Sequence, residues 1–212
     1  MMKLNIKFTS FFTVLFCLTF VAKSQQLING NLSTGALNGL SVQAPSGYTW
    51  SEIQNGNNTL GYVGTAGTYL LADDFTVCSN WTLSKITLYA YVTTSSTLTS
   101  SPFNDLRLAI YNGDPQVGGS SIVYGSLSTN VYQSSFRANV YRVANSTTDY
   151  TRELWKIEFN LSYAIAPGTY WLAYSLGNTL SLASNVPPST VVGSLTQIGN
   201  NAKQLNISTI CI

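Results

Sequence analysis

Residues 155–161 read WKIEFNL, and this stretch decides the fold. The odd-numbered positions are all apolar, whereas the even-numbered ones are a lysine, a glutamate and an asparagine. Successive side chains of a β-strand point to opposite faces of the sheet, so a period of two predicts a strand that is buried on one face. We therefore expect Trp155 to lie in a core and Lys156 and Glu158 to face water.

The same alternation recurs on both sides of this stretch. It predicts strands near residues 86–93, 106–110 and 170–176, and further strands near 48–53, 69–77, 122–124 and 136–143. Trp81 and Leu83 lie on the opposite phase to Ile86, so a bulge or a bend is expected near Lys85. Turn residues separate the runs, most clearly at 112–115 (NGDP) and 166–168 (APG).

About eight or nine short strands with turns between them predict an all-β protein. We expect an antiparallel β-sandwich, jelly-roll-like, formed by a single domain over residues 25–212. Residues 25–58 are rich in Asn, Gly and Ser and alternate only weakly. They are predicted to be either an edge strand with loops or a loop-rich, mobile arm.

Residues 1–24 have the three-part pattern of a secretory signal peptide. Lys3 and Lys7 form a basic start, residues 11–21 are apolar, and residues 22–24 fit a small-x-small cleavage site. The segment is too short and wrongly flanked for a stable transmembrane helix. We therefore expect a secreted, extracellular or cell-surface protein without membrane insertion.

The remaining residues carry little charge and no histidine. Three of the ten basic residues lie in the signal, which leaves seven basic against eight acidic residues and no basic block. Binding to nucleic acid is therefore not expected. Without histidine the usual general base is missing, so we expect no enzyme activity. A glycoside hydrolase would need two facing carboxylates, but Glu158 beside Lys156 is interpreted as an exposed ion pair.

Two small groups of residues are candidates for a disulfide and a metal site. Cys78 and Cys211 both follow the signal and pair in one interpretation, while in the other both thiols stay free. Asp73 and Asp74, with Asp114, offer the oxygen ligands that Ca²⁺ prefers. In the alternative, one of these aspartates caps a turn or pairs with an arginine. No other cofactor is predicted.

Four aromatic residues lie on the phase opposite the apolar face of their strands: Tyr89, Tyr91, Tyr111 and Trp171. Exposed aromatic rings stack on the apolar faces of sugars, while polar neighbours bind the hydroxyls. The four residues are therefore candidate ligand contacts. The alternative is that their strands are buried on both faces, or that the tyrosines form cross-strand pairs.

Several short motifs recur in a fixed order: ADDF at 72–75, IYNGDP at 110–115, YRV at 141–143 and APGTYWL at 166–172. Together they resemble an uncharacterised family of secreted β-sandwich proteins found mainly in Bacteroidetes-type organisms, over residues 69–204. The resemblance implies an extracellular binding or surface module. Family members continue into a further apolar strand, so a final strand is expected to be missing after Ile212, which would expose a sheet edge.

These features predict a secreted, non-catalytic binding module that recognises a carbohydrate or another cell-surface ligand. The alternative is a structural or adhesive surface protein that acts through protein–protein contacts, with edge-strand pairing as a natural mode. A carboxylate-based glycoside hydrolase is the third hypothesis. The expected partners are accordingly a polysaccharide or a surface protein, and the sequence does not fix the oligomeric state.

Overall fold

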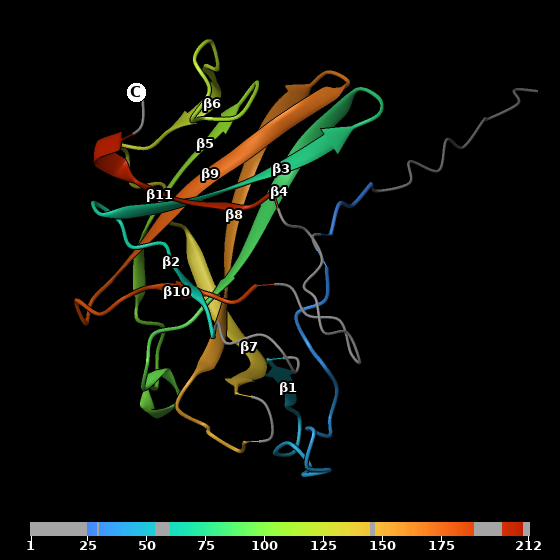
Figure 1. The fold of residues 1–212 in the computed structure, drawn as a ribbon, viewed down its shortest axis with the longest axis vertical. Coiled ribbons are helices and arrows are strands. Elements are labelled where there is room, and N and C mark those ends of the chain that lie inside the picture. The colour runs from blue at the N-terminus through green and yellow to red at the C-terminus, as the bar shows by residue number, and fades with distance from the viewer. Residues whose placement is uncertain (1–24, 29, 54–59, 145–146, 189–200, 210–212) are drawn as a thin grey trace, which may run out of the picture.

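The computed structural model describes residues 25–28, 30–53, 60–144, 147–188 and 201–209, so the predicted signal peptide lies outside it. The described residues form an all-β fold of eleven strands with two short 3₁₀ helices (Figure 1). The strands are β1 (Thr49–Glu52), β2 (Tyr62–Val63), β3 (Tyr69–Val77), β4 (Trp81–Ala90), β5 (Phe103–Tyr111), β6 (Ile122–Ser126), β7 (Ser134–Val143), β8 (Glu153–Ile165), β9 (Gly168–Asn178), β10 (Asn185–Val186) and β11 (Lys203–Asn206). The helices are η1 (Ser95–Thr97) and η2 (Ile207–Thr209). Neither is long and apolar enough to cross a membrane.

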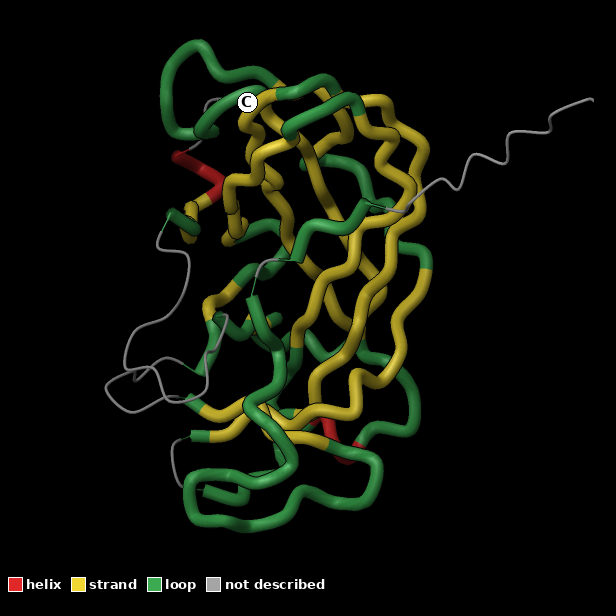
Figure 2. The backbone as a smooth tube through the Cα atoms, turned by 90° about the vertical axis from the view of Figure 1, so that its right-hand side faces the viewer, coloured by secondary structure: helices red, strands yellow, loops and turns green. Residues whose placement is uncertain are grey.

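Two sheets form the sandwich. One has the order β1-β7-β8-β4 and the other the order β11-β3-β9-β5-β6, and β10 and β2 make a small third sheet. Every strand pair is antiparallel except β1 with β7, which is parallel. The long strands run side by side along the molecule, with loops gathered at its two ends (Figure 2). The predicted β-sandwich is confirmed, but these strand orders do not confirm a jelly roll.

The main core lies between the two sheets. Trp155, Ile157 and Phe159 of β8 face Leu106 and Leu108 of β5 across it, and all five are buried. Residues 155–161 therefore form a strand that is buried on one face, as their alternation predicted. Full burial of a large apolar side chain stabilises a fold by about 1.5–3 kcal/mol, so this layer accounts for much of the cohesion between the sheets.

Two local predictions are also confirmed. The pairing of β4 with β8 shifts register between Leu83 and Lys85, as the change of phase indicated. Within residues 25–58, Thr49–Glu52 form β1, an edge strand of the four-stranded sheet, and the described residues before it form loops and isolated bridges. Trp50 of β1 is fully buried, and its indole Nε1 donates to the Val42 carbonyl oxygen at 3.0 Å. Residues 54–58 lie outside the described residues.

A buried arginine holds the β1–β7 end of the sandwich together. Arg142 of β7 has no exposed surface, and its Nε donates to the carbonyl oxygen of Leu60 at 2.8 Å. Its Nη1 donates to the Ser51 hydroxyl at 3.1 Å. Burial lowers the pKa of Arg142 to about 10, against an opposing effect of Tyr91. The guanidinium thus stays charged near neutral pH and ties three separate segments to one point.

Candidate ligand-binding site

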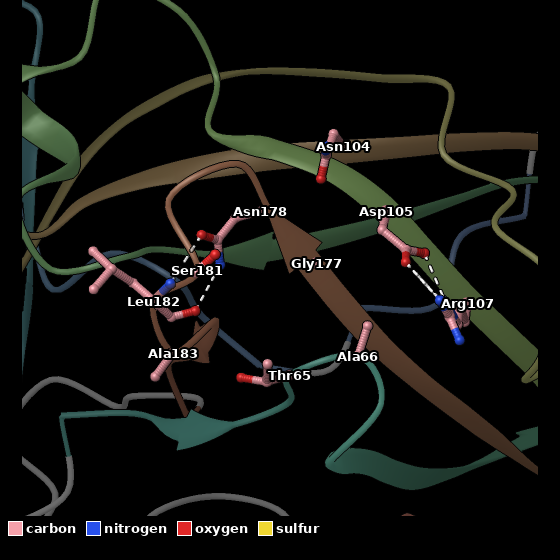
Figure 3. Close-up of a pocket in the computed structure, with 10 residues that line it drawn as sticks. All are labelled: Thr65, Ala66, Asn104, Asp105, Arg107, Gly177, Asn178, Ser181, Leu182 and Ala183. Carbon is pink, nitrogen blue, oxygen red and sulfur yellow. Dashed lines mark hydrogen bonds and ion pairs between the residues drawn. The ribbon is translucent and has the colours of Figure 1, made fainter.

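An open groove of about 430 Å³ lies at one end of the five-stranded sheet, on the side away from the main core (Figure 3). Strands β5 and β9 form its floor, and the segments at 65–66 and 181–183 form its sides. Ten residues line it: Thr65, Ala66, Asn104, Asp105, Arg107, Gly177, Asn178, Ser181, Leu182 and Ala183. Polar side chains predominate, so the groove suits a hydrophilic ligand.

The floor of the groove is shaped by a local irregularity in the sheet. The β5–β9 register shifts between Phe103 and Asp105, so Asn104 is an extra residue on its strand. Gly177 lies opposite Asp105, and a Cβ at Gly177 would be only 2.7 Å from the Asp105 Cβ. Only glycine allows this close approach, and the missing side chain leaves the floor hollow.

A charged pair stands on this floor. Arg107 Nη2 lies 3.0 Å from Asp105 Oδ2, and Arg107 Nε donates to Asp105 Oδ1 and Oδ2 at 3.3 and 3.2 Å. The two side chains keep 32% and 20% of their surface exposed. The fork fixes both planar groups in one orientation, so donors and acceptors are presented side by side to a ligand.

Hydrogen bonds of Asn178 hold one side of the groove in place. Its Oδ1 accepts from the Leu180 and Leu182 N–H groups at 3.1 and 3.3 Å, and its Nδ2 donates to the Leu182 carbonyl at 2.7 Å. The Ser184 N–H donates to the Thr65 hydroxyl at 3.1 Å and so links the two sides. The groove is therefore preformed, which reduces the entropy lost on binding.

The structure corrects the expected exposure of two aromatic residues in the five-stranded sheet. Tyr111 and Trp171 do point away from the main core, but only 2% and 9% of their surface is exposed. Their neighbours across the strands include Ala72, Ala109 and Ala173, whose small side chains let the rings pack closely on the sheet. The result is a second, smaller core on the outer face, which the phase of the alternation could not reveal.

The other two candidate aromatics belong to β4 and to the residue that follows it. Tyr91 is also buried, at 3% exposure, because its backbone pairs with Asn185 and the ring packs beside Val140 and Leu154. Burial raises the pKa of Tyr91, against the opposing effects of Arg142 and Arg152. Tyr89 alone stays partly exposed, on the outer face of the four-stranded sheet opposite Lys156.

The three candidate calcium ligands are not brought together. Asp73 and Asp74 are consecutive in β3, so their side chains point to opposite faces of the sheet. Asp114 instead forms an ion pair with Lys203, whose Nζ lies 5.2 Å from the centre of the Trp171 ring. Among the described residues, no group of three His, Cys, Asp or Glu side chains is arranged to hold a metal ion.

A second depression, of about 330 Å³, lies beside this ion pair. Asp114, Trp171, Asn201, Ala202 and Lys203 line it. The structure thus brings together two predicted site residues, Asp114 and Trp171. The Lys203 ammonium group, which the sequence pattern did not single out, lies over the Trp171 ring. This arrangement fastens β11 to the loop after β5, so its contribution to the fold is clearer than any role in binding.

The remaining candidate residues are accounted for separately. Glu158 forms ion pairs with Lys156 and Lys85, so the predicted pairing is confirmed, although only 18% of the Glu158 side chain is exposed. Glu153 is fully buried, accepts a hydrogen bond from the Tyr48 hydroxyl at 2.9 Å and pairs with Arg137. The side chain of Cys78 is exposed. Cys211 lies outside the described residues, so the proposed disulfide stays a prediction.

The sequence contains a weak indication of the groove, although the alternation of apolar residues does not reveal it. Asp105 and Arg107 are two residues apart on a strand with buried neighbours, which places both on the outer face. Gly177 interrupts the alternation of β9 at the matching level of the sheet. Comparisons of the chain with protein-family models, curated sequences and solved structures give no match.

Proposed function

We propose that this protein is a secreted, non-catalytic module that binds a carbohydrate, and that the groove holds the saccharide. The observation that carries the proposal is the Asp105–Arg107 fork on the floor of an open, preformed groove. The exposed side chain of Asn104 and the hydroxyl of Ser181 line the same space and add donors and acceptors.

The chemistry of these groups suits a sugar. Each hydroxyl of a vicinal diol both donates and accepts, so the carboxylate can accept from one hydroxyl while the neighbouring guanidinium donates to the next. The side-chain amide of Asn104 can both donate and accept hydrogen bonds. Leu182, which is 41% exposed, and Ala66 offer apolar surface to the C–H face of the ring. Polar specificity and apolar contact are thus combined in one groove.

The arrangement of carboxylates supports binding without hydrolysis. Glycoside hydrolysis uses two carboxyl groups that flank the scissile bond, about 5–10 Å apart. Asp105 is the one carboxylate among the residues that line the groove, and it is already paired with Arg107. Glu153 and Glu158 are committed to ion pairs elsewhere.

The test is retention of the purified protein on a panel of immobilised neutral and acidic glycans. Arg107→Ala and Asp105→Asn should each weaken binding to the retained glycan about tenfold or more, since each removes charge-assisted hydrogen bonds. Arg152→Ala is the matched control, because Arg152 also pairs with a nearby surface aspartate, Asp149, but lies outside the groove. Each variant is first checked for cooperative thermal unfolding.

Retention that is lost in both groove variants and kept in Arg152→Ala would support the proposal. A wild-type protein that unfolds cooperatively yet is retained on none of the glycans would contradict it. Retention that survives Arg107→Ala unchanged would show that the groove is not the saccharide site.

A further inference from the structure

A row of three side chains crosses the outer face of the four-stranded sheet. Phe136 of β7 is paired with Lys156 of β8, and Lys156 is paired with Tyr89 of β4. Paired residues point to the same face, and Trp155 and Ile157, on either side of Lys156, are buried in the main core. The row therefore faces outward, on the side of the sandwich opposite to the groove.

The aromatic surface of this row is open. Phe136 is 51% exposed, the largest exposed fraction of any aromatic side chain among the described residues. Lys156 Nζ lies over one face of the Phe136 ring, 5.7 Å from its centre, so a positive charge stands beside the exposed aromatic surface. Neighbouring strands are about 4.8 Å apart, so the backbones of Phe136 and Tyr89 are separated by about 10 Å. An open row of this length suits an extended chain better than a small, enclosed ligand.

The charges beside the row leave an excess of positive charge. Glu158 Oε1 lies 3.0 Å from Lys156 Nζ, and Glu158 Oε2 lies 3.3 Å from Lys85 Nζ. The hydrogen bond from Lys156, together with that from Lys85, lowers the pKa of Glu158, so the carboxylate is ionised near neutral pH. One carboxylate between two ammonium groups leaves one net positive charge next to the exposed ring.

Neutral polar groups lie on one side of the row. Gln133 Nε2 donates to the Asn160 carbonyl at 3.0 Å, and the Asn160 N–H donates back to Gln133 Oε1 at 2.9 Å. Ser134 and Thr87 lie on either side of Glu158 in the next cross-strand row. Hydroxyl and amide groups thus lie beside the aromatic and charged centre, where a polyhydroxylated ligand could use them.

We propose that this face is a second binding surface and that its ligand is an acidic polysaccharide built of uronate units. The apolar face of a sugar ring would stack on Phe136, and its carboxylate would lie near Lys156 and Lys85, which supply the complementary charge. The inference goes beyond the function proposed for the groove, because it rests on different residues of the other sheet.

The experiment compares polygalacturonate with its methyl-esterified form, which keeps the sugar backbone and loses the charge. Affinity electrophoresis measures binding of the wild type, Phe136→Ala, Lys156→Gln and Tyr62→Ala. Tyr62→Ala is the matched control, because Tyr62 is a 43% exposed aromatic residue outside this face. Arg107→Ala is added to separate this surface from the groove.

We expect the wild type to bind polygalacturonate and to bind the ester much more weakly, with affinity that falls as salt is added. Phe136→Ala and Lys156→Gln should each lose about tenfold in affinity for polygalacturonate, while Tyr62→Ala should bind like the wild type. Equal binding of acid and ester, or unchanged binding by Phe136→Ala, would overturn the inference. Loss of polygalacturonate binding in Arg107→Ala alone would also overturn it and would assign that ligand to the groove.

Discussion

Gly177 sets the depth of the groove at the scale of a single residue. It lies opposite Asp105 at the point where β5 gains an extra residue, and the approach of the two strands leaves no room for a Cβ. The shape of the groove thus depends on the absence of a Cβ atom at Gly177. A methyl group here would push on the side chain that forms the fork with Arg107.

Gly177→Ala should therefore destabilise the protein by about 1–3 kcal/mol, as overpacking does, and should weaken glycan binding through displacement of Asp105. Denaturant unfolding and the glycan retention assay measure the two effects. Gly118→Ala is the matched control, because a Cβ at Gly118 meets nothing within 4 Å. If both alanine variants unfolded at the same denaturant concentration, the close approach at Gly177 would not be a real constraint.

The aromatic residues show what sequence can and cannot settle at this scale. Alternation correctly assigned Trp171 and Tyr111 to the face away from the main core. It could not show that alanines on neighbouring strands let those rings pack on the sheet, because cross-strand neighbours are far apart in the chain. The sequence does not single out Phe136 for the same reason, since its partner Lys156 belongs to another strand.

At the scale of elements, the sheet edges carry charges and irregularities that discourage pairing with other chains. Strand β4 is an edge of its sheet and has ten residues, a length that invites strand addition. Its register shift and Lys85 interrupt that edge. Among the described strands, β11 pairs with only Tyr69–Ala72 of β3, and the acidic pair Asp73-Asp74 follows directly. These aspartates thus suit edge protection better than metal binding.

Lys85→Val should make the protein self-associate as its concentration rises, because it removes the charge that guards the β4 edge. Lys156→Val is the matched control: the same change is made on β8, a central strand with both edges paired. Light scattering coupled to size exclusion measures the oligomeric state. Monomeric behaviour of Lys85→Val at every concentration, or equal association of both variants, would refute edge protection by this lysine.

The ion pair between Asp114 and Lys203 fastens β11 to the loop that follows β5. Burial raises the pKa of Asp114, but hydrogen bonds from Lys203 and the Gln116 N–H outweigh it, so the pKa falls below the ordinary value of 3.8. A carboxyl group with a lowered folded-state pKa stabilises the fold above its unfolded pKa. That contribution is lost as the pH falls through the folded value.

Asp114→Asn should therefore lower stability by at most about 1 kcal/mol near neutral pH, and the difference from wild type should shrink to nothing in strong acid. Thermal unfolding followed across this pH range measures the difference. Lys203→Gln should cause the same loss, and the double variant should lose no more than either single change. A difference that stays constant into strong acid would rule out this ion pair as its source.

At the scale of the whole molecule, the sequence predicted the strands much better than their arrangement. The predicted stretch 69–77 coincides with β3, and each predicted strand contains or overlaps a real one. The two-residue strands β2 and β10, the C-terminal β11 and the parallel pairing of β1 were missed. Alternation is a local property, whereas pairing is decided between distant segments, and the groove is assembled from three such segments.

The same distant pairing has a consequence for how the chain reaches its folded state. Leu71 of β3 pairs with Tyr174 of β9, and Thr49 of β1 pairs with Val140 of β7. Such long loops must close before the contacts repay their entropy, so we expect refolding on the millisecond-to-second scale. Stopped-flow tryptophan fluorescence measures this rate, and completion within microseconds would contradict it.

A nascent chain that ends before β9 lacks the central strand of the five-stranded sheet and so cannot close the main core. For a protein expected to leave the cytoplasm through a narrow translocation channel, this delay is useful. The topology itself would keep the polypeptide unfolded, and so able to pass through the channel, until nearly all of it has been synthesised. Folding would follow on the far side of the membrane.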